Sequence, residues 1–305
     1  MNIEDVRAFV AVVDTGSVGR AAVRLNLTQP AISRRIQRLE QALGVSLLDR
    51  DCKPARPTRL GEMAYGRCVA VLRATEALTR DAHDVAPTGP LRIGVSPGIA
   101  DSIFACALEA VEASYPKIQL RLSTARSVEL RKQAADGLLD AAIVMARMDR
   151  PIEGPGAMAL GSERVVVVAP GSARFNSPCR LADLGGWRWV INPDGCGFRK
   201  QLDQALAAGG HGLEVAAESW GTALQLILIA RGVGLGLVPE RLIAESPHAA
   251  ALQIVKVRDF CPQLAVWLIR SAASGPLADT LQAVGVAVRG LLAKSHGTAA
   301  AGQRG

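Results

Sequence analysis

Side chains that could read the edges of nucleic-acid bases gather in one short segment near the N-terminus, residues 29–38. Glutamine can form two hydrogen bonds with adenine, arginine can form two with guanine or bind a phosphate, and proline can contact a thymine methyl group. Ile32, Ile36 and Leu39 recur at helical spacing and define the buried face of a helix through this segment. The opposite face would fit a major groove. It consists of Gln29, Pro30, Ser33, Arg34 and Gln37.

Residues suited to helix ends predict that this helix is the second of a helix-turn-helix. Ser17 can cap a first helix that ends near Leu25, and residues 26–27 make the turn. Thr28 can cap the second helix, and Pro30 falls in its first turn, where the missing N–H group costs nothing.

Two further arginines, Arg35 and Arg38, flank the outward face and are expected to contact phosphates. Taken alone, the segment is equally consistent with an ordinary amphipathic helix whose basic face is only solvated. The surrounding residues favour the nucleic-acid interpretation.

Many fixed spacings run through about the first sixty residues. They comprise residues 9–13, 16–17, 21–22, 25, 28–33, 36, 39–40, 43–45, 47–50, 58 and 61. This pattern closely resembles the N-terminal domain of LysR-type transcriptional regulators. It departs from the family at Leu48, where the family usually has Phe, and at Pro57 before Thr58. Both departures concern the core or the wing.

The resemblance implies a winged helix-turn-helix that binds double-stranded DNA. Residues 50–57 would form the wing, where Lys53 or Arg56 would reach a minor groove or a phosphate, although solvated loop charge is the alternative for both. The expected DNA-contacting set is Ser17, Thr28, Gln29, Pro30, Ser33, Arg34, Arg35, Arg38, Lys53 and Arg56.

A heptad stripe follows the wing between Thr58 and about Val85. Such a stripe needs a partner, either a second copy of the chain or the protein's own core. The family uses this linker helix for an antiparallel dimer contact, so the resemblance implies a homodimer; a homotetramer is common in the family but is not readable here. The stripe is Ala64, Cys68, Val71, Thr75, Leu78, Ala82 and Val85.

The rest of the chain has the pattern of an α/β fold. Residues 87–90, Pro-Thr-Gly-Pro, cannot continue a helix and predict a linker. Beyond it, short apolar runs alternate with amphipathic stretches, which indicates βαβ units and a mainly parallel sheet. The expected strands are 91–95, 118–122, 140–144, 165–169, 189–191 and 264–269, and the expected helices are 102–114, 127–135, 198–208 and 222–230.

This half resembles the family's effector domain, which is related to periplasmic binding proteins. The matching pieces are residues 91–94, 115–116, 137–143 and 230–239. Such domains have two α/β lobes, and the chain crosses between them near residues 145–161 and 266–269. The expected organisation is 1–60 winged helix-turn-helix, 61–90 linker helix and hinge, 91–160 with 267–295 lobe I, 161–266 lobe II, and 296–305 a disordered tail.

A small-molecule effector would lie between the lobes, at the carboxyl ends of strands and near helix N-termini. Arg126 and Arg147 could pair with a carboxylate, which favours an organic anion as the effector. For each residue, a helix cap or a solvated loop is the alternative. The candidate effector contacts are Ser96, Pro97, Thr124, Arg126, Arg147, Asn192 and Thr222.

Other classes of protein fit less well. The N-terminus lacks the pattern of an export signal and no apolar run is long enough to span a membrane, so a cytoplasmic location is expected and a solute-binding protein is not. No catalytic motif or clustered histidine is present, and residues 232–236 (GVGLG) end a helix instead of opening one, so we expect neither an enzyme nor a nucleotide cofactor. The six scattered cysteines favour neither a zinc site nor a disulfide framework.

Peroxide sensing is a further alternative, because some members of the family carry a reactive and a resolving cysteine in the second lobe. Cys196 lies near the corresponding loop, but alignment on Arg199 puts Gly197 at the reactive position. We therefore expect a two-state regulator in which effector binding changes the lobes and, through them, the bound DNA. RNA polymerase is an expected further partner of such a regulator.

Overall fold

The computed structural model describes residues 1–49, 52, 54, 56–81, 88–154, 156–176, 178–194 and 196–301. The predictions for Lys53, Ala82, Val85 and Pro87 lie outside this part of the chain. The described residues separate into two compact units. The N-terminal unit contains the first four helices with residues 132–140 and 271–278, and the sheet unit contains the other described residues.

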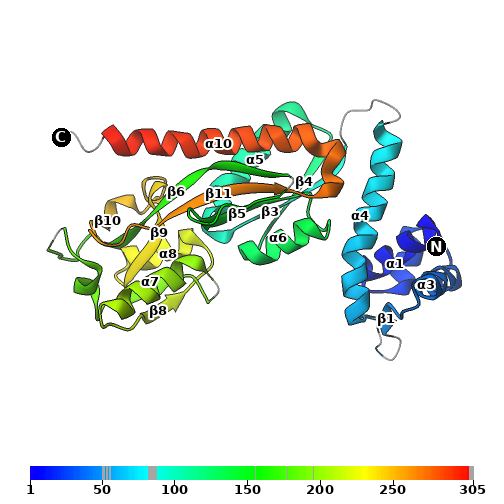
Figure 1. The fold of residues 1–305 in the computed structure, drawn as a ribbon, viewed down its shortest axis with the longest axis horizontal. Coiled ribbons are helices and arrows are strands. Elements are labelled where there is room, and N and C mark those ends of the chain that lie inside the picture. Colours follow the sequence, from blue (N-terminus) through cyan, green and yellow to red (C-terminus); the bar gives the residue numbers. More distant parts are fainter. Residues whose placement is uncertain are drawn as a thin grey trace. The chain divides into compact units, whose positions relative to one another are not determined.

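The N-terminal unit is a small helical bundle with a two-stranded wing (Figure 1). Asn2, Ser17 and Thr28 cap the first three helices through their side-chain oxygens, which confirms the two caps predicted from the sequence. Gly16 and Gly44 end two of them in the left-handed conformation that glycine adopts easily. The elements are α1 Ile3–Thr15, α2 Val18–Arg24, α3 Gln29–Leu43, β1 Leu48–Asp49, β2 Arg56–Pro57 and α4 Arg59–Asp81.

The wing is tied to the end of α3 by one carboxylate. Glu40 accepts hydrogen bonds from the backbone N–H groups of Leu47, at 2.8 Å, and Leu48, at 3.2 Å. Leu48 is buried, so the position where the family usually has Phe is filled by a smaller apolar side chain. A Cβ atom on Gly61 would lie 2.0 Å from the carbonyl oxygen of Leu47, so only glycine allows α4 to approach the wing this closely.

The sheet unit is built on nine strands in the order β4-β3-β5-β11-β6-β9-β7-β8, with β10 also paired to β6. Parallel pairs form two groups, β4-β3-β5 and β9-β7-β8, whereas the pairs made by β6 and β11 are antiparallel. The prediction of a mainly parallel sheet therefore holds within each group but not for the sheet as a whole. The strands are β3 Gly89–Val95, β4 Ile118–Thr124, β5 Ala141–Arg147, β6 Ala157–Pro170, β7 Arg188–Ile191, β8 Glu214–Glu218, β9 Leu235–Pro239, β10 Leu252–Val255 and β11 Gln263–Arg270.

Two long antiparallel strands join these groups. β6 pairs with β11 through its first half and with β9 and β10 through its second half. Gly161 faces Val266 across this ladder, where the register shifts and Gly161 has a φ of 152°. The lobe boundaries expected near residues 160 and 266 stay a prediction.

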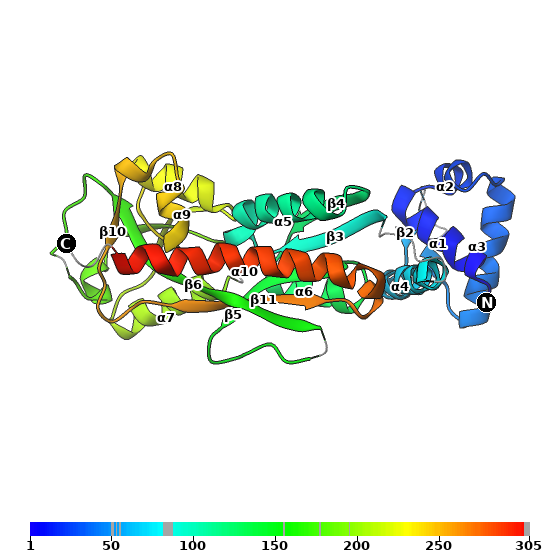
Figure 2. The same cartoon turned by 90° about the horizontal axis from the view of Figure 1, so that it is seen from above.

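Alternation along β6 buries both of its faces. Val165, Val167 and Ala169 pack with the apolar side of α7, whereas Val166 and Val168 pack with α8 and α9. In Figure 1, α5 and α10 cover one face of the β3–β5 part of the sheet, and Figure 2 shows α10 lying along β6 and β11. The helices are α5 Ala100–Ser114, α6 Ser127–Ala135, α7 Gly197–Ala208, α8 Thr222–Ala230, α9 Glu240–Ala244 and α10 Ala278–Ala301, with a 3-10 turn at Pro97–Ile99.

The structure differs from the sequence interpretation in several elements, and neither α9 nor α10 was among the predicted helices. Strands β8, β9 and β10 were not predicted as strands, and α10 continues to Ala301 although a disordered tail was expected from residue 296. Alanines 299–301 favour the helical conformation, which explains the extension. Among the residues described, no helix combines the length and apolar character needed to cross a lipid bilayer.

A buried ion pair braces the two strand groups. Arg241 of α9 donates to Glu163 of β6 at 2.8 Å, and the two side chains are only 6% and 3% exposed. The same guanidinium donates to the hydroxyl of Ser102 in α5 at 2.8 Å. One side chain therefore links the second strand group, a crossing strand and a helix of the first group.

We expect Glu163→Gln to lower the free energy of unfolding by up to about 3 kcal/mol, because the buried Arg241 charge then keeps only the half-exposed Glu245 carboxylate, at 3.1 Å, as its counter-ion. Chemical denaturation followed by circular dichroism measures this change. Asp149→Asn is the matched control, since the Arg147–Asp149 pair is exposed on both sides. Equal stability of the two variants would show that the buried pair does not brace the fold.

Candidate nucleic-acid interface and ligand site

The outward face of α3 is exposed, with the Gln29 side chain lying beside Gly19 of α2. Gln29, Pro30, Ser33, Arg34 and Gln37 are exposed. The opposite residues, Ile32, Ile36 and Leu39, are buried against α1, which confirms the face predicted from the spacing. The structure therefore presents every side chain suited to base contact on one exposed helix surface.

The two flanking arginines are held by acids of α1. Arg35 donates to the Glu4 carboxylate at 2.8 Å, and its side chain is 22% exposed. Arg38 donates to the buried Asp5 carboxylate at 2.6 Å but remains 59% exposed. Sequence reasoning missed these acids, because which side chains of α1 meet α3 depends on how the helices cross.

In the wing, Arg56 is exposed and available to a polyanion. Cys52 is also exposed, and its thiol donates to the Asp49 carboxylate at 3.4 Å. This hydrogen bond and the charge of Asp49 raise the pKa of the Cys52 thiol. Cys52 is therefore mainly a neutral thiol at neutral pH, in keeping with an incidental role.

Ser96, a predicted ligand residue at the end of β3, bonds to the first residue of α6, Ser127. The hydroxyls of Ser96 and Ser127 are 2.9 Å apart, and Ser127 donates to the carbonyl oxygen of Met145 at 3.2 Å. Because Ser127 has only one hydroxyl proton, Ser96 is the donor to Ser127. Both hydroxyls then keep acceptor capacity for a ligand donor. Thr124 and Arg126 are exposed nearby in sequence.

The second strand group contributes an amide cluster. Asn192 and Gln225, both buried, donate to the carbonyl oxygen of Ser219 at 3.3 and 2.9 Å. Thr222 donates to the carbonyl oxygen of Gly98 at 3.2 Å. This last bond connects the start of α8 with the turn after β3, so the two expected halves of the ligand site are in direct contact.

Two arginines near these elements form ion pairs with carboxylates of the same unit. Arg199 pairs with Asp194 at 3.0 Å and with Glu218, and the Glu218 hydrogen bond raises the pKa of Arg199. Arg147, predicted as a ligand contact, forms a bidentate pair with Asp149 at 2.8 and 2.6 Å. Sequence reasoning placed Ser127 at the end of a loop expected to line the site without giving it a contact, and it missed Gln225, because which residues of a helix meet the strands depends on packing.

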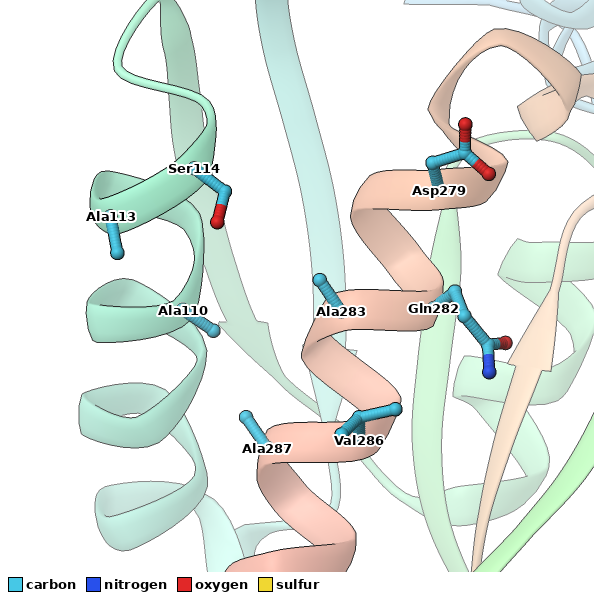
Figure 3. A pocket seen from close by; sticks show the side chains of 8 residues that line it. All are labelled: Ala110, Ala113, Ser114, Asp279, Gln282, Ala283, Val286 and Ala287. Carbon is cyan, nitrogen blue, oxygen red and sulfur yellow. The ribbon is translucent and has the colours of Figure 1, made fainter.

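An open groove lies elsewhere in the sheet unit, between α5 and α10 (Figure 3). Its walls are mostly small side chains, with Asp279 and Gln282 at one end. Ala110 is ten residues along α5 from Ala100, or about 15 Å at the helical rise. The groove is therefore separate from the predicted ligand residues. Its lining is Ala110, Ala113, Ser114, Asp279, Gln282, Ala283, Val286 and Ala287.

The heptad stripe on α4 divides between two environments. Ala64 and Cys68 pack against the core of the N-terminal unit, and Cys68 is buried. Further along the helix, Val71 and Leu78 are exposed, and Leu78 is 73% exposed. The protein's own core thus covers the first turns of the stripe, and contact of the exposed part with a second copy stays a prediction.

A winged helix-turn-helix, a long helix and a sheet with two parallel strand groups define a DNA-binding regulator with a ligand-binding second half. Two family models match the chain accordingly. The model for the bacterial regulatory helix-turn-helix protein of the lysR family matches residues 3–62, and that for the LysR substrate binding domain matches residues 85–285. The chain belongs to the LysR family of transcriptional regulators.

Curated relatives cover most of the chain. The nitrogen assimilation regulatory protein nac of Escherichia coli K12 is 30% identical over 246 residues, 79% of either chain. The small neutral protease regulatory protein of Streptomyces coelicolor is 30% identical over 74% of this chain and 70% of its own. A hydrogen peroxide-inducible genes activator of Haemophilus influenzae is 26% identical over 94% and 96%.

Solved structures share the fold along nearly the whole chain. A full-length OxyR variant from Pseudomonas aeruginosa superposes with a TM-score of 0.76 at 21% identity, covering 95% of both chains. ArgP from Mycobacterium tuberculosis superposes with a TM-score of 0.69 at 21% identity, covering 93% of this chain and 96% of its own. At this identity the likeness concerns the fold.

We expect Cys196→Ser to leave DNA affinity unchanged, with or without hydrogen peroxide. Burial raises the pKa of the Cys196 thiol, which lowers the fraction of reactive thiolate at neutral pH. Fluorescence anisotropy with labelled duplex measures the affinity, and Cys261→Ser, which removes an exposed thiol, is the control. A peroxide response that disappears only in the Cys196 variant would contradict this prediction.

Proposed function

We propose that this regulator binds a two-fold related operator as a homodimer, with the outward face of α3 in the major groove of each half-site. The exposure of Gln29, Ser33 and Arg34 opposite a fully buried face carries the proposal. Ser17, Thr28, Pro30, Arg38 and Arg56 would add contacts to backbone or bases, and Lys53 remains a predicted contact. Arg35 is a weaker candidate, because its guanidinium is engaged by Glu4.

The dimer would form through the outer part of α4. Val71 and Leu78 are exposed on one stripe of a long helix, and a second copy of that helix would bury them. A two-fold protein matches a two-fold DNA site, which fits the use of one recognition helix per half-site. Assembly of two dimers into a tetramer is a further step that the family allows.

The effector would bind between the two strand groups, where Ser96 begins the turn after β3 and Thr222 contacts that turn. The Thr222–Gly98 hydrogen bond joins the groups in the present arrangement, and a ligand there would contact both. Arg126, exposed and without an ion-pair partner among the described residues, supports an organic anion. The remaining proposed contacts are Pro97, Thr124, Arg147 and Asn192.

Effector binding would act by favouring one of two arrangements of the strand groups. A ligand shifts such an equilibrium only by its difference in affinity for the two states. Contacts that bridge Ser96 and Thr222 would supply that difference, because they exist only when the groups are close. We further propose a cytoplasmic regulator that acts on RNA polymerase at the promoter and has no catalytic activity of its own.

Replacing Gln29 or Arg34 by alanine tests the DNA-binding surface. We expect each variant to lose on the order of 1–3 kcal/mol of discrimination between a duplex enriched by the protein from a random-sequence pool and a mixed-sequence duplex. Anisotropy across a salt series measures both affinities. Gln204, an exposed residue of α7 outside the N-terminal unit, provides the control variant Gln204→Ala. Unchanged discrimination in both test variants would refute the assignment of α3.

A charge on the α4 stripe tests the dimer. We expect Leu78→Glu to shift the protein towards monomer in sedimentation equilibrium, because two carboxylates would face each other across the helix pair. Its melting temperature should stay close to the wild-type value, since Leu78 is exposed within the chain. Val128→Glu, at an 80% exposed position outside α4, is the control. An unchanged dimer in the Leu78 variant would place the contact elsewhere.

A further inference from the structure

We propose that Asp5 is a positioning residue for DNA binding, whose buried carboxylate holds the Arg38 guanidinium at the edge of α3 for a phosphate contact. The inference rests on the proposed use of α3 in the major groove. It assigns a role in DNA binding to a residue of α1, which does not belong to the recognition helix.

The ion pair is asymmetric in its exposure. The Asp5 side chain is 4% exposed, whereas that of Arg38 is 59% exposed, and a single bond of 2.6 Å joins Oδ1 to Nη2. A guanidinium has five N–H donors in a planar fork, so one is used and the others remain available towards solvent. The pair therefore presents a fixed set of donors outward and does not bury the positive charge.

Asp5 can fix the orientation of the Arg38 guanidinium because the core of the N-terminal unit fixes the position of Asp5. It lies in the first turn of α1, between residues that fill the N-terminal core, and its neighbours Val6 and Phe9 are buried. The N-terminal end of a helix also favours a carboxylate, through its free backbone N–H groups and dipole. A long arginine side chain that is already ordered loses less rotamer entropy when it binds a phosphate.

Arg38 stands where a phosphate contact is useful. It follows Arg34 by four residues, so the two side chains lie one turn apart on neighbouring positions of the same helix surface. Arg34 points to the proposed groove-facing side, and Arg38 lies towards α1, at the flank of that surface. A strand of the DNA backbone bordering the groove would pass this flank.

The neighbouring pair of Glu4 and Arg35 serves as an internal comparison. Arg35 is only 22% exposed, and its Nη1 atom donates to both the carboxylate and the carbonyl oxygen of Glu4. Glu4 also accepts from Arg7 at 2.6 Å. This second pair ties α1 to α3 and offers few donors outward, so its loss should not weaken DNA binding.

The change in net charge and the loss of Arg38 positioning predict opposite effects of Asp5→Asn on DNA affinity. Asp5→Asn removes a negative charge beside the DNA-facing surface, so simple electrostatics would tighten binding to any duplex. If Asp5 positions Arg38, the same change weakens binding, because a neutral amide oxygen holds the guanidinium less firmly than a carboxylate does. Weaker binding by a more positive protein therefore distinguishes the two accounts.

The experiment measures the affinity of the full chain for a duplex enriched from a random-sequence pool, across a salt series. We expect Asp5→Asn and Arg38→Ala each to bind about tenfold more weakly and to reduce the salt slope by about 1, as for one lost phosphate contact. The double variant should bind no more weakly than Arg38→Ala alone. Glu4→Gln, the matched control, should bind as tightly as wild type or more tightly.

Wild-type or tighter binding by Asp5→Asn would overturn the inference, as would independent losses in the double variant. Thermal melting verifies the fold of each variant. If Asp5→Asn does not melt cooperatively, Arg38→Lys decides: it keeps a charge at an exposed position without the guanidinium fork, and wild-type affinity there would overturn the inference. Arg34→Ala in the same assay separates failure of this inference from failure of the proposed function. Unweakened binding by Arg34→Ala would refute the use of α3 itself.

Discussion

The burial of one edge of α3 against α1 is the contact on which the DNA-binding half depends. Ile32, Ile36 and Leu39 meet Phe9 and Val12 in a core from which water is excluded. Once that edge is buried, the rotation of α3 about its axis is settled, and the polar residues between the apolar positions must face outward. The same contact brings the acids of α1 to the flanking arginines. The packing of one side of α3 therefore decides which side chains its other side exposes.

The architecture of the sheet unit depends on two strands, β6 and β11, that lie between its two parallel groups. β6 alternates its buried side chains between α7 on one face and α8 and α9 on the other, so a single strand anchors three helices. β6 and β11 pair along the crossing, which leaves the carboxyl ends of the parallel strands as the place where turns from both groups meet. Thr222 on Gly98 and Arg241 on Ser102 are hydrogen bonds between the groups. Any rearrangement of the groups has to alter these contacts.

Apolar spacing and short apolar runs were enough to predict many of the elements. The recognition helix, its caps and six of the strands follow from apolar spacing and turn chemistry. β8 was missed because its sequence, EVAAE, is small and polar at the edge of the sheet, and β9 because its apolar run belongs to a glycine-rich segment interpreted as a helix end. Neither strand carries a long β-branched run that would distinguish it from a loop or a buried helix.

Contacts between elements could not be predicted in the same way. The sequence places Arg38 on α3 and Asp5 on α1 but contains no information about their separation, which depends on the crossing of the helices. Likewise Ser127 and Gln225 appear as ordinary helical residues until packing places them beside Ser96 and Ser219. The resemblance to a family supplied the class of ligand site, and only the structure showed which polar side chains bond to one another.

The most direct test of the account is a structure of the full chain bound to a duplex that it enriches from a random-sequence pool. We predict that two copies occupy two half-sites, each with residues 29–37 of α3 in the major groove and Gln29 or Arg34 within hydrogen-bond distance of base edges. A complex in which α3 lies outside the groove, or in which its exposed face contacts only protein, would contradict it.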